Sequence, residues 1–269
     1  MRTLVHLSDL HFGRTDDAVL EPLLAAVARA KPDVVVVSGD LTQRARGREF
    51  AQARAFLDRL PRPQVVVPGN HDVPLYRLWE RFLSPFGKYR RLIGSDLEPS
   101  FVDDEIAVIG VNTARSLTFK NGRINEEQMA AIRRRLDPLA ESVLKVVVTH
   151  HPFDLPERPG DDGLVGRARA AMEVFSRCGV DLLLAGHFHT SEAGATSARY
   201  EIAGYAALVV QAGTATSTRG RGEQNSFNVL RVTSGEIVVE RMAWRADAAA
   251  FLIERSERFV RDGARWTEC

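Results

Sequence analysis

Five short apolar segments of the sequence are each followed by side chains that can bind a divalent metal ion. One of these segments, residues 65–67, is β-branched and is ended by Pro68 and Gly69, which is typical of a buried strand. The polar side chains that follow the five segments are Asp9 and His11, Asp40, Asn70 and His71, His150, and His187 and His189. Ligands of open α/β sheets bind at the carboxyl ends of the strands. We therefore expect these side chains to converge on one pocket.

The types of these side chains indicate which ions the pocket would hold. Carboxylate oxygen and imidazole nitrogen suit Mn, Fe and Zn, and the absence of thiolate from the set argues against a structural zinc site. The candidate ligands outnumber those that one tetrahedral ion needs, but they suit two ions if a carboxylate bridges them; they are Asp9, His11, Asp40, Asn70, His150, His187 and His189. On an extended segment, His187 and His189 would project to the same side and serve adjacent ions, and the same holds for Asp9 and His11.

The elements that must position these residues form an alternating pattern. Residues 4–7, a helix with Leu20, Leu23 and Leu24, and residues 34–37 predict a β-α-β unit with a parallel strand pair and a right-handed crossover. Further helices are expected over residues 47–60, 124–139 and 166–177, and an antiparallel hairpin over residues 101–111.

The segment from residue 73 to residue 99 allows two interpretations. Leu75, Leu78, Trp79, Phe82 and Leu83 predict a helix over the sheet. Packing of this helix on the core is the favoured interpretation, and aromatic side chains that hold a substrate beside the pocket are the alternative.

Residues 190–269 predict short antiparallel strands and a C-terminal helix. The strands are expected over residues 195–202, 207–211, 226–232 and 236–243, and Phe251, Leu252, Phe259 and Val260 indicate the helix. This helix would pack on the domain or on a second subunit, which leaves a homodimer open. Because no linker or repeat interrupts the chain, we expect a single domain over residues 1–269.

Composition excludes several classes of protein. The chain has 269 residues, 45% of them hydrophobic, and a formal net charge of +1, so it lacks the basic character expected for binding a nucleic acid duplex. Two cysteines, Cys178 and Cys269, indicate no disulfide framework and suit a reducing compartment. No signal peptide and no apolar stretch of the roughly 20 residues that a membrane span needs are evident. We expect a cytoplasmic protein.

The order of the motifs resembles that of the calcineurin-like metallophosphoesterase superfamily. The motifs are Asp9-x-His11, Gly39-Asp40, Gly69-Asn70-His71-Asp72, His150 and Gly186-His187-Phe188-His189. The resemblance covers roughly residues 4 to 190 and is strongest to bacterial class III cyclic-nucleotide phosphodiesterases and glycerophosphodiesterases. It implies an α/β fold, a four-layer α/β/β/α sandwich of two mixed β-sheets.

The resemblance also implies a role for each motif residue. Two divalent ions, Mn, Fe or Zn with Mn and Fe favoured, would be bound, the first by Asp9, His11 and His189 and the second by Asn70, His150 and His187, with Asp40 bridging. A metal-bridging hydroxide would attack the phosphorus of a small phosphodiester, of which a 3′,5′-cyclic nucleotide is the best single candidate. Asn70 and His71 would contact the phosphate, and His71 would protonate the departing alkoxide.

Some positions depart from the superfamily pattern or have two readings. Gln43 stands where some of these phosphatases have an aspartate that orients the catalytic histidine, so Asp72 or another group would have to orient His71. His151 is interpreted as a supporting or structural residue. Arg219 and Arg221 could reach a phosphate, although exposed arginines are common.

Other functions stay open at this point. The same site would serve a phosphomonoesterase or a broad-specificity phosphoesterase. A UDP-sugar-lipid pyrophosphohydrolase is disfavoured, because that family typically carries Arg where His71 stands. A non-catalytic scaffold of this fold would be expected to lack a ligand, and none is missing. Whether the loops over residues 73–99, 152–165 and 213–224 contact the substrate is not determined.

Overall fold

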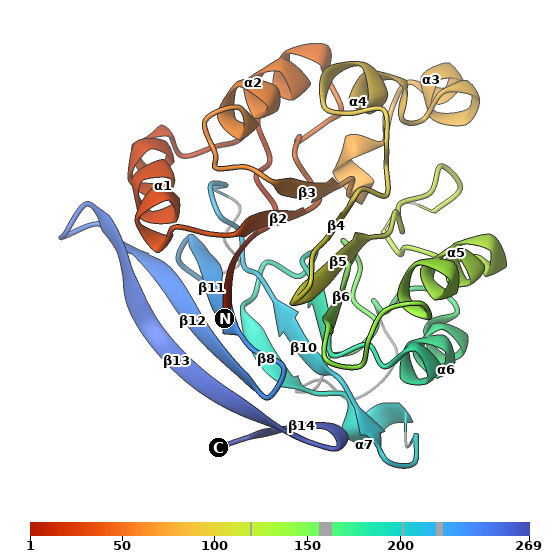
Figure 1. Cartoon of the computed structure of the whole chain (residues 1–269). Helices are drawn as coiled ribbons and strands as arrows, with labels where there is room; N and C mark the ends of the chain where they lie inside the picture. Colours follow the sequence, from red (N-terminus) through yellow and green to blue (C-terminus); the bar gives the residue numbers. More distant parts are fainter. Residues whose placement is uncertain (119, 156–162, 201, 219–222) are drawn as a thin grey trace.

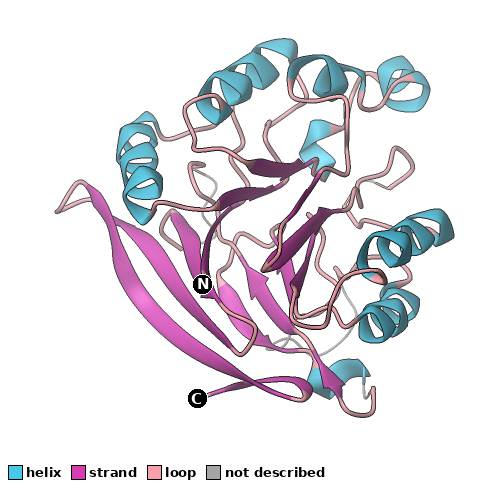
Figure 2. Ribbon diagram, viewed as in Figure 1, coloured by secondary structure: helices cyan, strands magenta, loops and turns pink. Residues whose placement is uncertain are grey.

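Two β-sheets packed face to face form the centre of the molecule, and helices cover the outer face of each (Figures 1 and 2). The structure is a computed structural model, and it describes residues 1–118, 120–155, 163–200, 202–218 and 223–269. The predicted four-layer α/β/β/α arrangement is confirmed.

The first sheet contains the N-terminal strands together with the last strands of the chain. Its strands are β1 (Arg2–Leu7), β2 (Val34–Ser38), β3 (Gln64–Val67), β9 (Tyr205–Ala206), β11 (Ser226–Val232), β12 (Glu236–Arg245), β13 (Ala250–Asp262) and β14 (Ala264–Glu268). Among the described residues their order is β3-β2-β1-β11-β12-β13-β14-β9. The pairs β1·β2 and β2·β3 are parallel, as the β-α-β pattern predicts, whereas β11 to β14 are antiparallel.

The second sheet is assembled from the middle of the chain. Its strands are β4 (Ser100–Val102), β5 (Ile106–Gly110), β6 (Leu144–Val148), β7 (Leu182–Ala185), β8 (Glu192–Ala195) and β10 (Leu208–Gln211). Among the described residues their order is β4-β5-β6-β7-β10-β8, and the predicted antiparallel hairpin is the pair β4·β5. The strand expected over residues 195–202 is wrong over residues 197–200, because β8 covers Glu192–Ala195 and helix α7 (Ser197–Tyr200) follows it.

Helices connect the parallel strands of both sheets. They are α1 (Asp17–Ala30), α2 (Gly47–Leu57), the short 3₁₀ helix η1 (Asn70–Asp72), α3 (Leu78–Leu83), α4 (Gly87–Leu92), α5 (Glu126–Leu136) and α6 (Ala168–Cys178). Helices α1, α2 and α4 lie on the side of the first sheet, and α5 and α6 lie on the side of the second (Figure 1).

Alternation along the strands divides the core into three layers. In β2, Val35 and Val37 pack with the helices of the first sheet, whereas Val34 and Val36 pack between the two sheets. Strand β6 meets them there with Val146 and Val148. Because successive strand residues point to opposite faces, a strand covered on both sides must be apolar throughout, which explains the uninterrupted valine runs.

The C-terminal helix predicted from Phe251, Leu252, Phe259 and Val260 is wrong, because these residues belong to the long strand β13. Strand β13 pairs with β12 from Ala250 to Val260, and the register skips Glu254, so the strand contains a bulge. Phe251 therefore packs beneath the helices of the first sheet, whereas Phe259 packs between the sheets. This change of face removes the strict alternation by which the sequence could have indicated a strand.

Helix α3 also differs from the favoured prediction that its apolar side chains pack on the core. Its apolar residues are exposed, Leu78 by 59%, Trp79 by 81%, Phe82 by 52% and Leu83 by 76%. The buried residue is Arg81, whose guanidinium donates to the carbonyls of Pro74 (3.0 Å) and Thr118 (2.9 Å). A helix of six residues buries one narrow face, and the two carbonyls hold the arginine on that face.

Among the described residues, no helix has both the length and the apolar character that crossing a membrane requires.

The burial of Trp266 provides a test of the C-terminal strands. Trp266 of β14 is 1% exposed and its indole nitrogen donates to Asp181 at the start of β7 (3.3 Å). Trp266→Ala is expected to lower the free energy of unfolding by about 3–5 kcal/mol through loss of buried contacts. Ile253→Ala, at a side chain that is 57% exposed, is the control and should cost less than about 1 kcal/mol. Urea unfolding of both variants measures this, and equal losses would contradict the strand packing described here.

Candidate metal centre

The predicted site residues all follow directly from the carboxyl ends of parallel strands. Asp9 and His11 follow β1, Asp40 follows β2, Asn70 and His71 form η1 after β3, His150 follows β6, and His187 and His189 follow β7. Strands of both sheets thus contribute to one place, where the distances below show that the side chains meet.

A first cluster joins Asp9, His11 and His189. The Oδ1 atom of Asp9 lies 3.5 Å from His11 Nε2 and 3.4 Å from His189 Nε2. The two imidazole rings stack with centroids 5.1 Å apart, and all three side chains are buried. Their potential ligand atoms lie close enough together to hold one metal ion.

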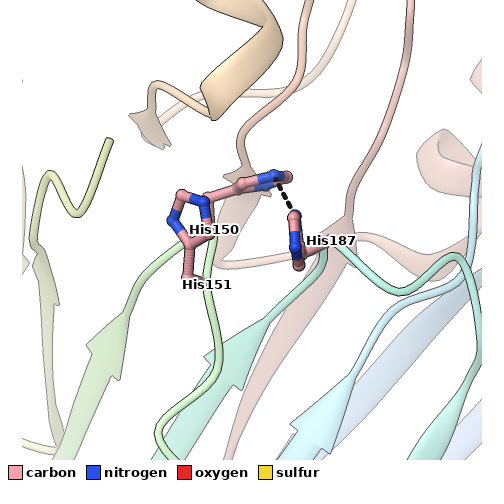
Figure 3. A group of neighbouring side chains, drawn as sticks. All are labelled: His150, His151 and His187. Carbon is pink, nitrogen blue, oxygen red and sulfur yellow. Dashed lines mark hydrogen bonds between the residues drawn. The ribbon is translucent and has the colours of Figure 1, made fainter. Parts of the chain in front are cut away.

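A second cluster joins Asn70, His150 and His187. His150 Nε2 lies 3.1 Å from Asn70 Oδ1 and 3.3 Å from His187 Nδ1. Figure 3 shows His187 beside His150 and His151. His151 packs against the same rings, with its centroid 4.8 Å from that of His150 and 4.7 Å from that of His187. Three imidazoles and an amide oxygen therefore surround a second candidate ion position.

Asp40 lies between the two clusters. Its Oδ2 atom is 3.8 Å from His11 Nε2 and 3.4 Å from His150 Nε2, and its Oδ1 atom accepts a hydrogen bond from the backbone N–H of His71 (2.8 Å). The carboxylate is 1% exposed. One side chain thus reaches both groups of imidazoles, which is the position that a bridging ligand requires.

The backbone that carries these residues is not extended. Asp9, His11, Asp40, His187 and His189 all have positive φ, between 47° and 78°. The prediction that residues two apart project to the same side assumed an extended segment, and this assumption is wrong. His187 and His189 do serve adjacent clusters, but through left-handed turns beyond the strand end, a conformation that costs of order 1–3 kcal/mol for each residue that is not glycine.

Two glycines of the motifs are required by close approach. A Cβ at Gly69 would collide with the carboxylate of Asp40, and a Cβ at Gly186 would collide with the hydroxyl of Ser8. The loops that carry the candidate ligands therefore touch backbone against side chain, and these motif positions need glycine for space.

The electrostatics of the site favour cations. Burial alone would raise the pKa of the Asp40 carboxyl, but His150 and His71 beside it hold that pKa well below its usual range. Burial likewise opposes the charge of His150, and the neighbouring Asp40 outweighs it and raises the pKa of His150 to about 9. Two buried carboxylates, Asp9 and Asp40, thus require positive charge close to them.

Unsatisfied polar atoms test whether the site fits metal ions. In the described part of the chain, neither ring nitrogen of His11 has a hydrogen-bond partner, and neither does Asp9 Oδ1. Buried polar atoms are rarely left without partners. Oxygen and nitrogen donors gathered in this way, without thiolate, fit divalent ions such as Mn, Fe or Zn.

Neighbouring groups fix the orientation of the candidate ligands. The backbone carbonyl of Ser38 accepts a hydrogen bond from His150 Nδ1 (2.8 Å), which leaves Nε2 directed at Asn70 and Asp40. Ser8 Oγ donates to Asp9 Oδ2 (2.6 Å) and fixes that carboxylate. Neither serine was predicted from the sequence. A serine closely precedes the aspartate at both strand ends, in Ser8-Asp9 and in Ser38-Gly39-Asp40, and this pattern could have indicated their role.

The group that orients His71 is the backbone of Gln43. His71 Nδ1 donates to the Gln43 carbonyl (2.9 Å), since a carbonyl only accepts. Asp72 has a different task, because it accepts from the backbone N–H groups of Gly69, Leu41 and Thr42 at 2.9 to 3.1 Å and joins the loops after β2 and β3. Burial, and then the nearby Asp40, raise the pKa of Asp72 to about 6.

Of the remaining predicted residues, His151 supports the second cluster, His6 lies apart from it, and the others fall outside the described residues. His6 is fully buried in β1 and contacts Ser38 Oγ at 2.9 Å, as expected of a core histidine. His151 Nδ1 contacts Thr113 Oγ1 at 2.8 Å. Arg219 and Arg221 lie outside the described residues, and so do parts of the loops over residues 152–165 and 213–224.

The raised pKa of His150 predicts proton release on metal binding. At pH 7 a group with a pKa of about 9 is protonated, and it must lose this proton before Nε2 can bind an ion. Titration of metal-free protein with Mn²⁺ should release about one proton from this residue, and apparent affinity should fall as the pH decreases below about 9. Calorimetry in buffers of different ionisation enthalpy measures the release, with His150→Ala as the control. Binding without proton release at pH 7 would contradict the charge assigned to His150.

Comparisons with known proteins agree with this geometry. A model of the family described as calcineurin-like phosphoesterase matches residues 2–191. The chain is 37% identical over 81 residues to a glycerophosphodiester phosphodiesterase GpdQ of Enterobacter lignolyticus (strain SCF1), covering 26% of this chain and 29% of that protein. It is 26% identical over 207 residues to the 3′,5′-cyclic adenosine monophosphate phosphodiesterase CpdA of Pseudomonas aeruginosa, covering 69% of each chain.

The aligned regions cover 29% and 58% of the lengths of two GpdQ relatives, the second of them a probable GpdQ from Arcobacter nitrofigilis. Two solved structures have the same fold at low sequence identity. A dimetal phosphatase from Danio rerio superposes with a TM-score of 0.67 at 15% identity over 90% of this chain and 96% of that chain. A purple acid phosphatase from yellow lupin seeds gives 0.72 at 11% identity over 97% of this chain and 54% of the other. Because the calcineurin-like phosphoesterase model matches residues 2–191, which is most of the chain, the chain belongs to the calcineurin-like phosphoesterase family.

Proposed function

We propose that the chain is a metal-dependent hydrolase of phosphodiesters. The observation that carries the proposal is the buried carboxylate of Asp40, which lies 3.8 Å from a nitrogen of the first cluster and 3.4 Å from one of the second. Asp9, His11 and His189 would hold one divalent ion, Asn70, His150 and His187 a second, and Asp40 both. Such a pair of ions supplies activation of water and neutralisation of the negative phosphate oxygens.

The residues of the chain supply the other parts of the reaction. His71 is held with Nδ1 on the Gln43 carbonyl, so Nε2 is the nitrogen that serves the substrate, and its ring lies 4.9 Å from that of His11. From this place it would contact the phosphate and give a proton to the departing oxygen, a contribution of roughly 10²–10⁴-fold. Asn70, beside it in η1, would contact the phosphate as well as the second ion.

The names of the relatives support diesters as the substrate class. Both glycerophosphodiester and 3′,5′-cyclic AMP phosphodiesterases are among them. We propose 3′,5′-cyclic nucleotides as the first substrates to test and glycerophosphodiesters as the second, with phosphomonoesters as the alternative on the same site. His71 in place of Arg disfavours a UDP-sugar-lipid pyrophosphohydrolase, and the complete ligand set disfavours a scaffold. A cytoplasmic location and a homodimer stay predictions.

A substrate panel tests the proposed function. Protein loaded with Mn²⁺ is expected to hydrolyse bis(p-nitrophenyl) phosphate faster than p-nitrophenyl phosphate, and to act on 3′,5′-cyclic AMP or a glycerophosphodiester. Chelation should abolish all of these activities, and readdition of Mn²⁺ should restore them. A preference for the monoester would replace the diester assignment, and activity of fully chelated protein would overturn metal dependence.

Substitutions of His71 and of Asp40 are expected to have different effects on metal content and rate. His71→Ala should retain the metal content of the parent protein and lose about 10²–10⁴-fold in kcat, because only proton transfer and phosphate contact are removed. Asp40→Ala should lose metal, because the side chain that reaches both clusters is gone. Metal analysis beside steady-state kinetics separates the two effects. A metal-replete His71→Ala protein with an unchanged rate would remove the role assigned to His71.

A further inference from the structure

A basic pocket is lined by two segments that continue from the loops around His71. It is lined by residues 44–47, residues 74–77 and Lys88, and has a volume of about 330 Å³. Its two walls continue the segments that hold the catalytic histidine, because Arg44 follows Gln43, the acceptor of the His71 hydrogen bond, and Pro74 lies three residues beyond His71. These two segments lead from His71 to the pocket, so a substrate arm that extends past His71 along them would reach it.

The charges around the pocket are predominantly positive. Four cations line it, and none of its lining residues is a carboxylate. Arg77 and Lys88 share one carboxylate, Glu80, and Arg46 lies 3.8 Å from Glu49 with its side chain largely exposed. Among the described residues, two carboxylates thus pair with three of the four cations, which leaves an excess of two positive charges at the pocket.

Arg44 is the cation best placed to recognise a ligand. Its guanidinium lies over the ring of Tyr76, 5.6 Å from the centroid, and no carboxylate of the described residues pairs with it. The residue is partly buried, and its backbone N–H donates to Glu49 Oε2 at 2.8 Å, which anchors the loop. A guanidinium held against an aromatic ring is pre-organised and loses little freedom when it binds an anion.

We propose that this pocket binds the departing arm of the phosphodiester and selects an arm that carries a second anionic group, a carboxylate or a phosphate, through Arg44. The proposal rests on the proposed function. In the reaction, the oxygen of water forms a bond to phosphorus and one proton of that water passes to the solvent. The bond from phosphorus to the oxygen of the arm breaks, and that oxygen receives a proton from His71, which regains one from the solvent. The products are a phosphomonoester and an alcohol or phenol that keeps its anionic group.

This subsite has a consequence for the order of substrates. A 3′,5′-cyclic nucleotide carries no anion besides the phosphate under attack, so it leaves the cations of the pocket uncompensated. An open-chain diester with an anionic arm would place a negative charge beside these cations. The subsite therefore reverses the order proposed from the relatives, and an open-chain diester with an anionic arm is expected to be a better substrate than a 3′,5′-cyclic nucleotide.

A matched pair of aryl diesters tests the subsite. Methyl 4-carboxyphenyl phosphate and methyl 4-carbamoylphenyl phosphate have leaving groups of nearly the same shape, and only the first is anionic on the arm. With Mn²⁺-loaded protein, kcat/KM should favour the carboxylate over the carboxamide by about tenfold or more, the range of a charge-assisted hydrogen bond. In Arg44→Gln this ratio should fall toward one, mainly through KM for the carboxylate.

Arg48→Gln is the control variant. Arg48 is an exposed arginine of α2 that does not line the pocket, so its loss changes the net charge equally and should leave the ratio at its original value. Equal kcat/KM for the two esters in the parent protein, or a ratio that survives in Arg44→Gln, would overturn the subsite while leaving the diesterase. A ratio that falls equally in Arg48→Gln would also overturn it, because the effect would then belong to the overall charge. Failure of all proteins to hydrolyse either ester or bis(p-nitrophenyl) phosphate would overturn the proposed function and the subsite with it.

Discussion

Two buried carboxylates that need positive charge are the constraint on which the site depends. Asp9 and Asp40 are at most 1% exposed, and the groups around them are mainly imidazoles. Burying a carboxylate without compensation is unfavourable by far more than a typical hydrogen bond contributes. Without bound ions, protonation of His150 supplies part of the compensation, which is why its pKa rises to about 9 although burial opposes the charge. Divalent ions would supply more charge and release that proton.

The fold keeps these unfavourable features together by packing. Left-handed turns at Asp9, Asp40 and His187 would not persist in an isolated loop, because each costs free energy. Here each turn leaves a strand that is buried on both faces, and the two sheets share an apolar layer that includes Leu4, Val36 and Val146. The packing of the sandwich therefore offsets the free-energy cost of these turns. Gly69 and Gly186 leave space for the side chains of Asp40 and Ser8.

The groups proposed for catalysis and substrate binding are positioned in a different way. His71 is oriented by the carbonyl of Gln43, and the same two segments continue outward as the walls of the basic pocket. The stacking of Arg44 on Tyr76 depends on this continuity. The candidate metal ligands and the proposed specificity pocket are thus connected through two short loops. We therefore expect a change in either loop to affect both the orientation of His71 and the binding of the substrate arm.

The convergence of the candidate site could be predicted from the amino-acid sequence alone. Apolar runs followed by Asp, Asn or His place polar groups at strand ends, and parallel pairing brings those ends to one edge, so residues from Asp9 to His189 could be assembled without coordinates. The faces on which some side chains lie, and the orientation of others, depend on tertiary packing. The bulge at Glu254 turns Phe251 and Phe259 to opposite faces, so their spacing fitted a helix as well as a strand. The carbonyls of Pro74 and Thr118 hold Arg81 inward and turn Trp79 outward, and a carbonyl likewise orients His71. Every residue has a backbone carbonyl, so the residue type carries no signal of which one will accept a hydrogen bond; that depends on the packing of segments distant in the chain.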